Sequence, residues 1–173
     1  AFHASEAGMV EVAIENWCKA GESSSDRVAN IEAIGHYENA LAELQRLPHG
    51  QERDEKELSI LLAMGVPLIA TTGYASHRVE NNFRRAEDLC LQLGDAENLF
   101  SVRRALWNFF LDKPDYNTGG ELANILLESA KLANDAEETM LAYRAVQSVC
   151  LYTGDLEGSQ KAGEAGLILA NDP

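Results

Sequence analysis

The sequence predicts an all-α fold, a solenoid of about four helical hairpins that bury their apolar faces against one another. Apolar residues recur at the three- and four-residue spacing of helices, and no segment shows the alternation of a strand. Small or aromatic residues at offsets 0, 4 and 7 return about every forty residues, a period typical of helical-repeat proteins. The four stripes are Ala33-Tyr37-Ala40, Val79-Phe83-Ala86, Gly119-Ala123-Leu126 and Ser159-Gly163-Gly166, and their first members lie 46, 40 and 40 residues apart.

Eight helices are expected from their start and stop signals. Val10, Ile14 and Trp17 share one face of the first helix, and glycines or prolines separate most of the later helices. The expected helices cover about residues 6–27, 30–47, 52–71, 76–94, 95–112, 118–134, 135–153 and 155–171.

Polar side chains that accept backbone N–H groups are expected to begin six of these helices. Thr118 with Glu121, and Asp135 with Glu138, have the three-residue spacing of a capping box. Short loops between the helices make neighbours antiparallel, so four consecutive hairpins follow. The six expected N-caps are Asn30, Ser76, Asp95, Thr118, Asp135 and Asp155.

The small residues of the stripes are interpreted as points where two helices cross closely. A longer side chain there would hold the two backbones apart. Glycine within a helix costs about 1 kcal/mol relative to alanine, so Gly163 and Gly166 in one helix need a packing reason. The alternative is a frayed last helix that merely tolerates glycine.

Composition excludes several classes of protein. The 173 residues fit one domain, residues 1–173, and the 14 basic against 28 acidic residues leave a net charge of −14. This charge repels nucleic acid and anionic membranes, and no apolar run approaches the ~20 residues of a membrane span. The acidic surface is either a solvated face or a means of recruiting basic partners. The chain starts at Ala1 in mid-pattern, so it is expected to be a fragment of a longer protein.

The sequence contains no pattern of a catalytic, cofactor-binding or metal site. It has no phosphate-binding loop, and no serine or cysteine has a histidine at a motif spacing. Three distant cysteines without a C-x-x-C pair favour reduced thiols in a cytoplasmic protein. Four histidines without ligand spacing are expected on the surface. These residues are Cys18, Cys90, Cys150, His3, His36, His49 and His77.

One constellation predicts a binding site. Arg104 and Asn108 are four residues apart on one helix face, and Arg144 and Ser148 take the corresponding places two helices later. If the first helices of the hairpins line a concave groove, this ladder suits a carboxylate or an acidic peptide end. The alternative is ordinary surface arginine paired with nearby glutamates. For Arg85 the expectation is solvent or a pair with Glu80 or Glu87.

The hairpins resemble tetratricopeptide repeats. Trp17, Ala20 and Gly21 precede the first stripe with the offsets of that consensus, and Tyr143, Val146 and Gln147 precede the last stripe in the same way. The resemblance implies a right-handed α-α solenoid that binds a protein or peptide. The period is longer than the consensus, which implies extended helices or loops.

A second resemblance covers nearly the whole chain. Three segments are similar to the repeat region of large bacterial signalling ATPases. They are the entry segment from Ser5 to Gly21, the segment 57–75, which contains Gly65, Pro67 and Gly73, and the segment 79–95. In that family a front module, often an adenylate or guanylate cyclase, precedes an AAA-like ATPase and then the repeats. The departure is the 114–117 segment, where relatives tend to have a glycine-containing turn.

The resemblance implies a non-catalytic interaction or sensing module, whose partner is a protein or peptide or the parent's own ATPase domain. The alternative is a regulatory tail of a cyclase or other NTP-dependent regulator whose catalytic domains lie upstream. A stand-alone helical enzyme is the third possibility, and no cofactor is expected. The end helices are expected to expose apolar flanks that allow the fragment to dimerise. Those flanks are Val10, Ile14 and Trp17, and Leu167, Ile168 and Leu169.

Overall fold

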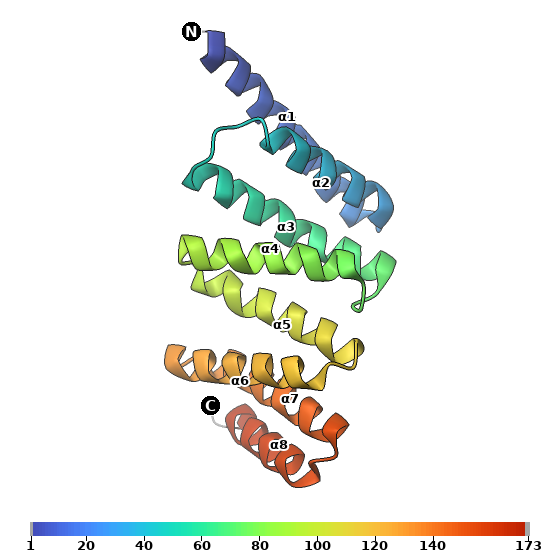
Figure 1. Cartoon of the computed structure of the whole chain (residues 1–173), viewed down its shortest axis with the longest axis vertical. Helices are drawn as coiled ribbons and strands as arrows, with labels where there is room; N and C mark the ends of the chain where they lie inside the picture. Colours follow the sequence, from blue (N-terminus) through green and yellow to red (C-terminus); the bar gives the residue numbers. More distant parts are fainter. Residues whose placement is uncertain (1, 172–173) are drawn as a thin grey trace. The chain divides into compact units, whose positions relative to one another are not determined.

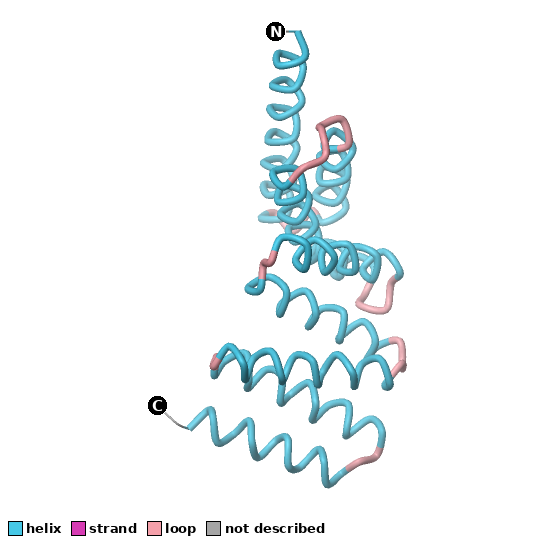
Figure 2. Tube along the Cα trace, turned by 60° about the vertical axis from the view of Figure 1, so that its left-hand side comes forward, coloured by secondary structure: helices cyan, strands magenta, loops and turns pink. Residues whose placement is uncertain are grey.

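A computed structural model describes residues 2–171, with the side chains of residues 8–170, and every regular element in it is an α-helix. The predicted all-α class is therefore confirmed for the described residues, which form helices joined by short loops (Figures 1 and 2). The helices are α1 (Phe2–Asp26), α2 (Asn30–Leu44), α3 (Gln51–Thr72), α4 (His77–Leu93), α5 (Ala96–Asp112), α6 (Tyr116–Ala133), α7 (Ala136–Thr153) and α8 (Leu156–Asn171).

The chain divides into two compact units. Unit 1, Ala1–Asp95, contains α1 to α4, and unit 2, Ala96–Pro173, contains α5 to α8. Within each unit consecutive helices pack against each other and run in opposite directions (Figure 1). In addition, α1 contacts α3 in unit 1, and α5 contacts α7 in unit 2. Each unit thus comprises two helical hairpins. The expectation of one domain over residues 1–173 stays a prediction.

The stripes of small and aromatic residues lie in the helix contacts, as predicted. Of their twelve members, eleven are buried, and Gly163 is half-buried. Ala33, Ala40 and Ala86 are completely inaccessible to solvent. Small side chains at these positions let the paired backbones approach closely, which is the reason the stripes recur.

In unit 1 a glycine of the first helix faces an aromatic ring of the second helix in each hairpin. A methyl group on Gly21 would lie 2.6 Å from Cε1 of Tyr37, and one on Gly65 would lie 2.6 Å from Cζ of Phe83. Real methyl groups do not approach other atoms so closely, so only glycine fits beneath each ring.

In the α7–α8 hairpin of unit 2 the large and small partners change places. Sixteen residues separate Gly21 from Tyr37, and the same spacing joins Gln147 to Gly163. Here the large side chain comes from the first helix, because a methyl group on Gly163 would lie 2.5 Å from Nε2 of Gln147. Gly166 lies beside Tyr143 of α7 in the same hairpin. Both glycines therefore lie against a packed helix, which supports the packing interpretation over a frayed terminus.

Three of the predicted N-caps are confirmed by hydrogen bonds. Ser76 Oγ accepts from the Arg78 amide at 3.2 Å, Asp135 Oδ1 from the Glu138 amide at 2.9 Å, and Asp155 Oδ1 from the Gly158 amide at 2.9 Å. Each bond satisfies an amide that has no partner within its helix.

Two predicted caps are wrong. Asn30 is the first residue of α2, and Ala29 stands at the cap position without a side-chain bond. Thr118 lies inside α6, which begins earlier because Asp115 is its cap. Asp115 accepts from both the amide (3.2 Å) and the hydroxyl (2.9 Å) of Thr118. Two acceptable cap residues lie three positions apart, and the carboxylate is the stronger acceptor. These bonds lower the pKa of Asp115.

Arg85 differs from its predicted environment because its partner is Glu57. Nε donates to Glu57 Oε1 at 2.7 Å and Nη2 donates to Oε2 at 2.9 Å, so the bidentate pair joins α4 to α3. Glu57 is buried, whereas the Arg85 side chain is 45% exposed. Hydrogen bonding to this carboxylate raises the pKa of Arg85. The expected pairing with Glu80 or Glu87 was wrong because the partner lies 28 residues away in the sequence.

The predicted apolar flank of the first helix is also wrong. Val10 and Ile14 are buried, and Trp17 is half-buried and stacks on His36 with the ring centroids 5.6 Å apart. Among the described side chains of α1, Met9 and Val12 are the large apolar ones that are exposed. At the other end, Leu167 and Ile168 are exposed as predicted, and Leu169 is half-buried. Dimerisation through these flanks stays a prediction.

Candidate binding surface

The structure places the four predicted ligand-binding residues on two helices of unit 2 that contact each other. Arg104 and Asn108 lie on α5, and Arg144 and Ser148 lie forty residues later on α7. Both arginines are exposed, and Asn108 and Ser148 are half-buried. The pairs therefore occupy equivalent positions in successive hairpins.

Asn108 and Ser148 direct their donors to their own helices. Asn108 Nδ2 donates to the Arg104 carbonyl at 3.1 Å, and Ser148 Oγ donates to the Arg144 carbonyl at 2.9 Å. Such bonds to the carbonyl four residues earlier satisfy the side chain locally. The guanidinium groups of Arg104 and Arg144 are therefore the principal donors that the ladder offers to a ligand.

Neither guanidinium forms an ion pair with a carboxylate among residues 8–170. Elsewhere in the described chain arginines do pair, for example Arg46 with Glu43 at 2.6 Å and Arg78 with Glu38 at 2.7 Å. The alternative of an arginine paired with a nearby glutamate thus describes those residues, but not Arg104 and Arg144. Two unpaired cations in so acidic a chain leave room for an external anionic group.

A groove runs beside Arg144 between α7 and α8. We call it the α7–α8 groove. It has a volume of about 340 Å³, and Tyr143, Arg144, Gln147, Gly163, Gly166 and Leu167 are among its lining residues. Two glycines are among the lining residues, and Arg144 is the one charged residue among them. The sequence did not predict this groove, because it depends on how the small side chains of α8 meet α7.

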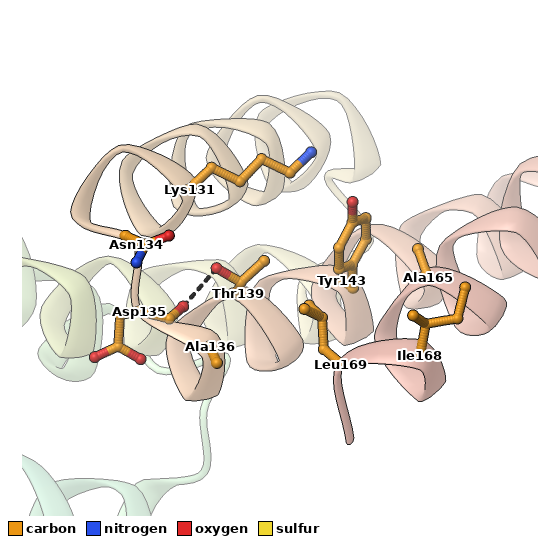
Figure 3. A pocket seen from close by; sticks show the side chains of 9 residues that line it. All are labelled: Lys131, Asn134, Asp135, Ala136, Thr139, Tyr143, Ala165, Ile168 and Leu169. Atoms are coloured by element: carbon orange, nitrogen blue, oxygen red, sulfur yellow. Dashed lines mark hydrogen bonds between the residues drawn. The ribbon is translucent and has the colours of Figure 1, made fainter. Parts of the chain in front are cut away.

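A second pocket of about 510 Å³ lies on the other side of Tyr143, among α6, α7 and α8 (Figure 3). Lys131 Nζ lies 5.0 Å from the centroid of the Tyr143 ring, a cation–π contact. Ala165, Ile168 and Leu169 of α8 form the apolar side of the pocket (Figure 3). Lys131 and Tyr143 are twelve residues apart, so no local sequence spacing predicts their contact.

Neither Cys18 nor Cys150 has the environment of a reactive thiolate. Burial, reinforced by nearby carboxylates, raises the pKa of the Cys18 and Cys150 thiols, which disfavours the reactive thiolate. Among the described residues no cluster of three potential metal ligands occurs. His49 Nδ1 lies 2.8 Å from Nη1 of Arg53, and the side chain of His3 lies outside the described residues. In the described part of the chain no helix combines the length and apolarity needed to cross a bilayer.

Comparison with known proteins adds one relative. The chain is 26% identical over 174 residues to uncharacterized protein R02095 of Rhizobium meliloti (strain 1021). The match covers 99% of this chain but only 17% of that protein, so the chain spans about one sixth of the relative's length. No family model matches the chain.

Proposed function

We propose that the chain is a tetratricopeptide-like interaction module of a larger protein, and that unit 2 binds an acidic segment of a partner with Arg104 and Arg144. The proposed array is a right-handed solenoid of four hairpins in a cytoplasmic protein. The consecutive hairpins and the buried small-residue stripes support a helical-repeat module. The segment's role in this proposal is binding, without catalysis.

The observation that carries the proposal is the lack of partners for the two arginines. Each guanidinium is exposed and has no ion pair among residues 8–170, although acidic residues outnumber basic residues two to one. A guanidinium can hold a carboxylate through two parallel hydrogen bonds. Equivalent arginines on the touching helices α5 and α7 therefore suit a peptide that carries successive carboxylates.

Binding to a fluorescein-labelled oligoglutamate peptide, followed by fluorescence anisotropy at low salt, tests this surface. Because a hydrogen bond to a charged group contributes about 1.5–3 kcal/mol, Arg104→Ala and Arg144→Ala should each weaken binding about tenfold or more. Arg46→Ala is the matched control, since that arginine already pairs with Glu43. If all three substitutions weaken binding equally, the peptide is held by general charge attraction and not by a specific site. If Arg104→Ala and Arg144→Ala leave the affinity unchanged, the proposed site is rejected.

A regulatory tail of a larger NTP-dependent protein is the second candidate. The single observation in its favour is that the aligned relative extends far beyond the region that matches this chain. In this version a partner, or a neighbouring ATPase domain of the same polypeptide, shifts the arrangement of the hairpins and so biases the active state of the parent protein. Affinity capture with the intact parent, with and without this segment, tests it: an unchanged set of bound proteins and an unchanged NTPase rate would reject the regulatory role.

A further inference from the structure

We infer that the N-terminus of α3 binds a small oxyanion of the phosphate type, held by backbone amides, Arg53 and Lys56. This site lies entirely in unit 1, so it is independent of the proposed Arg104–Arg144 surface in unit 2. We call it the α3 anion site. Its residues are Gly50, Gln51, Glu52, Arg53 and Lys56.

The first turn of α3 offers amides that no side chain caps. Gly50 stands at the cap position and accepts no side-chain hydrogen bond from the helix. The amide of Asp54 donates to the Gly50 carbonyl at 3.1 Å, which is the first backbone bond of the helix. The three preceding amides, of residues 51–53, therefore point out of the helix end. Because α3 is 22 residues long, the positive end of its dipole lies there too, and the two effects together favour an anion.

Arg53 adds a buried positive charge at this end of α3. The residue is only 6% exposed, yet it has no carboxylate partner among residues 8–170. Nη2 donates to Gln45 Oε1 at 2.8 Å, and Nη1 lies 2.8 Å from His49 Nδ1 and 3.5 Å from the Leu47 carbonyl oxygen. A guanidinium only donates, so Nδ1 of His49 accepts, and none of the three acceptors carries a negative charge. Burial of a charge without a counter-ion is costly, so this position favours an anion.

The guanidinium of Arg53 lies beyond the first turn of α3, on the side to which the free amides point. Helical side chains lean towards the N-terminus of their helix, and the contacts with Gln45 and His49 show this direction for Arg53. Nε of Arg53 is buried and has no hydrogen-bond partner among the described residues. One donor of a buried cation is therefore left for a ligand at the helix end.

A cavity of about 320 Å³ opens at this helix end. The loop between α2 and α3, the first turns of α3 and one residue of α1 line it (Figure 1). Its charged lining residues are Arg53, Lys56, Glu11 and Glu52. Lys56 Nζ lies 2.8 Å from Glu52 and 3.9 Å from Glu11, so the two cations balance the two carboxylates. The amides of α3 then make the site positive, in contrast to the net charge of −14 of the chain.

A tetrahedral oxyanion matches the arrangement of these donors. One oxygen can accept from the amides of the first turn and a second from Nε of Arg53, while Lys56 Nζ can turn from Glu52 to a third. The cavity is several times larger than the ~30 Å³ share of a water molecule, so it admits a phosphate ion with part of its hydration shell. Phosphate and sulfate are the ions of this class.

The test follows the backbone amide signals of the whole chain by two-dimensional NMR during titration with inorganic phosphate. The amides of residues 51–53 should shift and saturate, and sodium chloride at the same ionic strength should not reproduce the shifts. Arg53→Gln and Lys56→Gln should each weaken phosphate binding about tenfold or more, because each removes a charged hydrogen bond. Glu52→Gln should strengthen binding about twofold, because it removes a carboxylate and releases Lys56.

Arg46→Gln is the matched control. Arg46 belongs to the same loop and pairs with Glu43, but it does not line the cavity. If Arg53→Gln does not fold, the opposite effects of Lys56→Gln and Glu52→Gln decide the test. The inference is overturned if residues 51–53 show no saturable shift, if sodium chloride reproduces the shifts, or if these variants bind phosphate as tightly as the Arg46 variant does. Arg53 would then only brace the loop between α2 and α3.

A phosphate group can belong to the free ion or to a larger ligand. Phenyl phosphate, titrated in the same way, distinguishes these two sources. If inorganic phosphate saturates the α3 anion site and phenyl phosphate does not, the ligand is the free ion. If both saturate it at residues 51–53, the site accepts the phosphate group of a larger molecule. Saturation by neither overturns the inference.

Discussion

The ring of Tyr37 on α2 occupies the space into which a side chain at Gly21 on α1 would project. A methyl group at Gly21 would lie 2.6, 2.8 and 2.9 Å from three ring carbons of Tyr37, and the ring is itself buried. Gly65 and Phe83 repeat the arrangement in the next hairpin of unit 1. Glycine is therefore required at these two positions by the neighbouring ring, in helices where alanine would otherwise be favoured.

Gly21→Ala and Gly65→Ala should each destabilise the protein by about 1–3 kcal/mol, because overpacking against a buried ring outweighs the gain in helix propensity. The matched control is Gly35→Ala in α2, where no atom lies within 4 Å of the added methyl group. That substitution should stabilise the protein by about 0.5–1 kcal/mol. Urea denaturation measures all three. Equal stability of the Gly21 and Gly35 variants would contradict the close contact with Tyr37.

The Glu57–Arg85 pair should respond asymmetrically to substitution. Arg85→Ala leaves the buried Glu57 carboxylate without its two charged hydrogen bonds, and an unsatisfied buried acceptor costs about 1–3 kcal/mol. Glu57→Gln leaves a half-exposed guanidinium that water can solvate, so its cost should be smaller. Chemical denaturation of the two single variants and the double variant gives the coupling free energy. If Glu57→Gln lowers the free energy of unfolding more than Arg85→Ala does, the buried carboxylate is not the group that most needs its partner.

Glu138 should make stability depend on pH. Burial, together with the carboxylates of Asp135 and Glu137, raises the pKa of Glu138. The folded protein therefore holds this proton more tightly than the unfolded chain. Its contribution to stability is complete below the unfolded value of about 4.3 and is lost as the pH rises through the folded value.

Glu138→Gln should consequently stabilise the protein at pH 7, and the difference from the unsubstituted chain should shrink as the pH falls below about 4. Denaturation curves at both pH values check this. Glu32→Gln is the control, since Glu32 is also in the first turn of a helix but is exposed. If Glu138→Gln were destabilising at pH 7, the carboxylate would be making a favourable contact with the N-terminus of α7 that outweighs its burial.

Much of the fold could be predicted because its signals are local. The helices follow from apolar spacing and from the capping residues Ser76, Asp135 and Asp155, each of which acts within one turn. Where two local signals compete, sequence reasoning failed. Thr118 and Asp115 both offer a cap, and the carboxylate of Asp115 begins the helix earlier.

The candidate site could be predicted only in part. The spacing of Arg104 and Arg144 places them at equivalent positions on neighbouring hairpins, and this follows from the forty-residue period. The bonds that Asn108 and Ser148 make to their own helices were missed, although a four-residue spacing from a polar side chain to a carbonyl is a signal for them. The α7–α8 groove has no such signal, because it arises where two glycines meet the side chains of another helix.

By itself, the amino-acid order determined the all-α class and the positions of the helices, because both depend on neighbours within about two helical turns. The recurrence of small residues also predicted which positions are buried against a second helix. Only the tertiary structure decided that Glu57 forms an ion pair with Arg85 and that Lys131 lies over the ring of Tyr143. It also decided that Gly21 packs against Tyr37, whereas Gly163 packs against Gln147. These contacts join residues twelve or more positions apart. Which residues come into contact depends on side-chain volume and charge across a helix interface. The periodicity of a single helix does not predict those contacts.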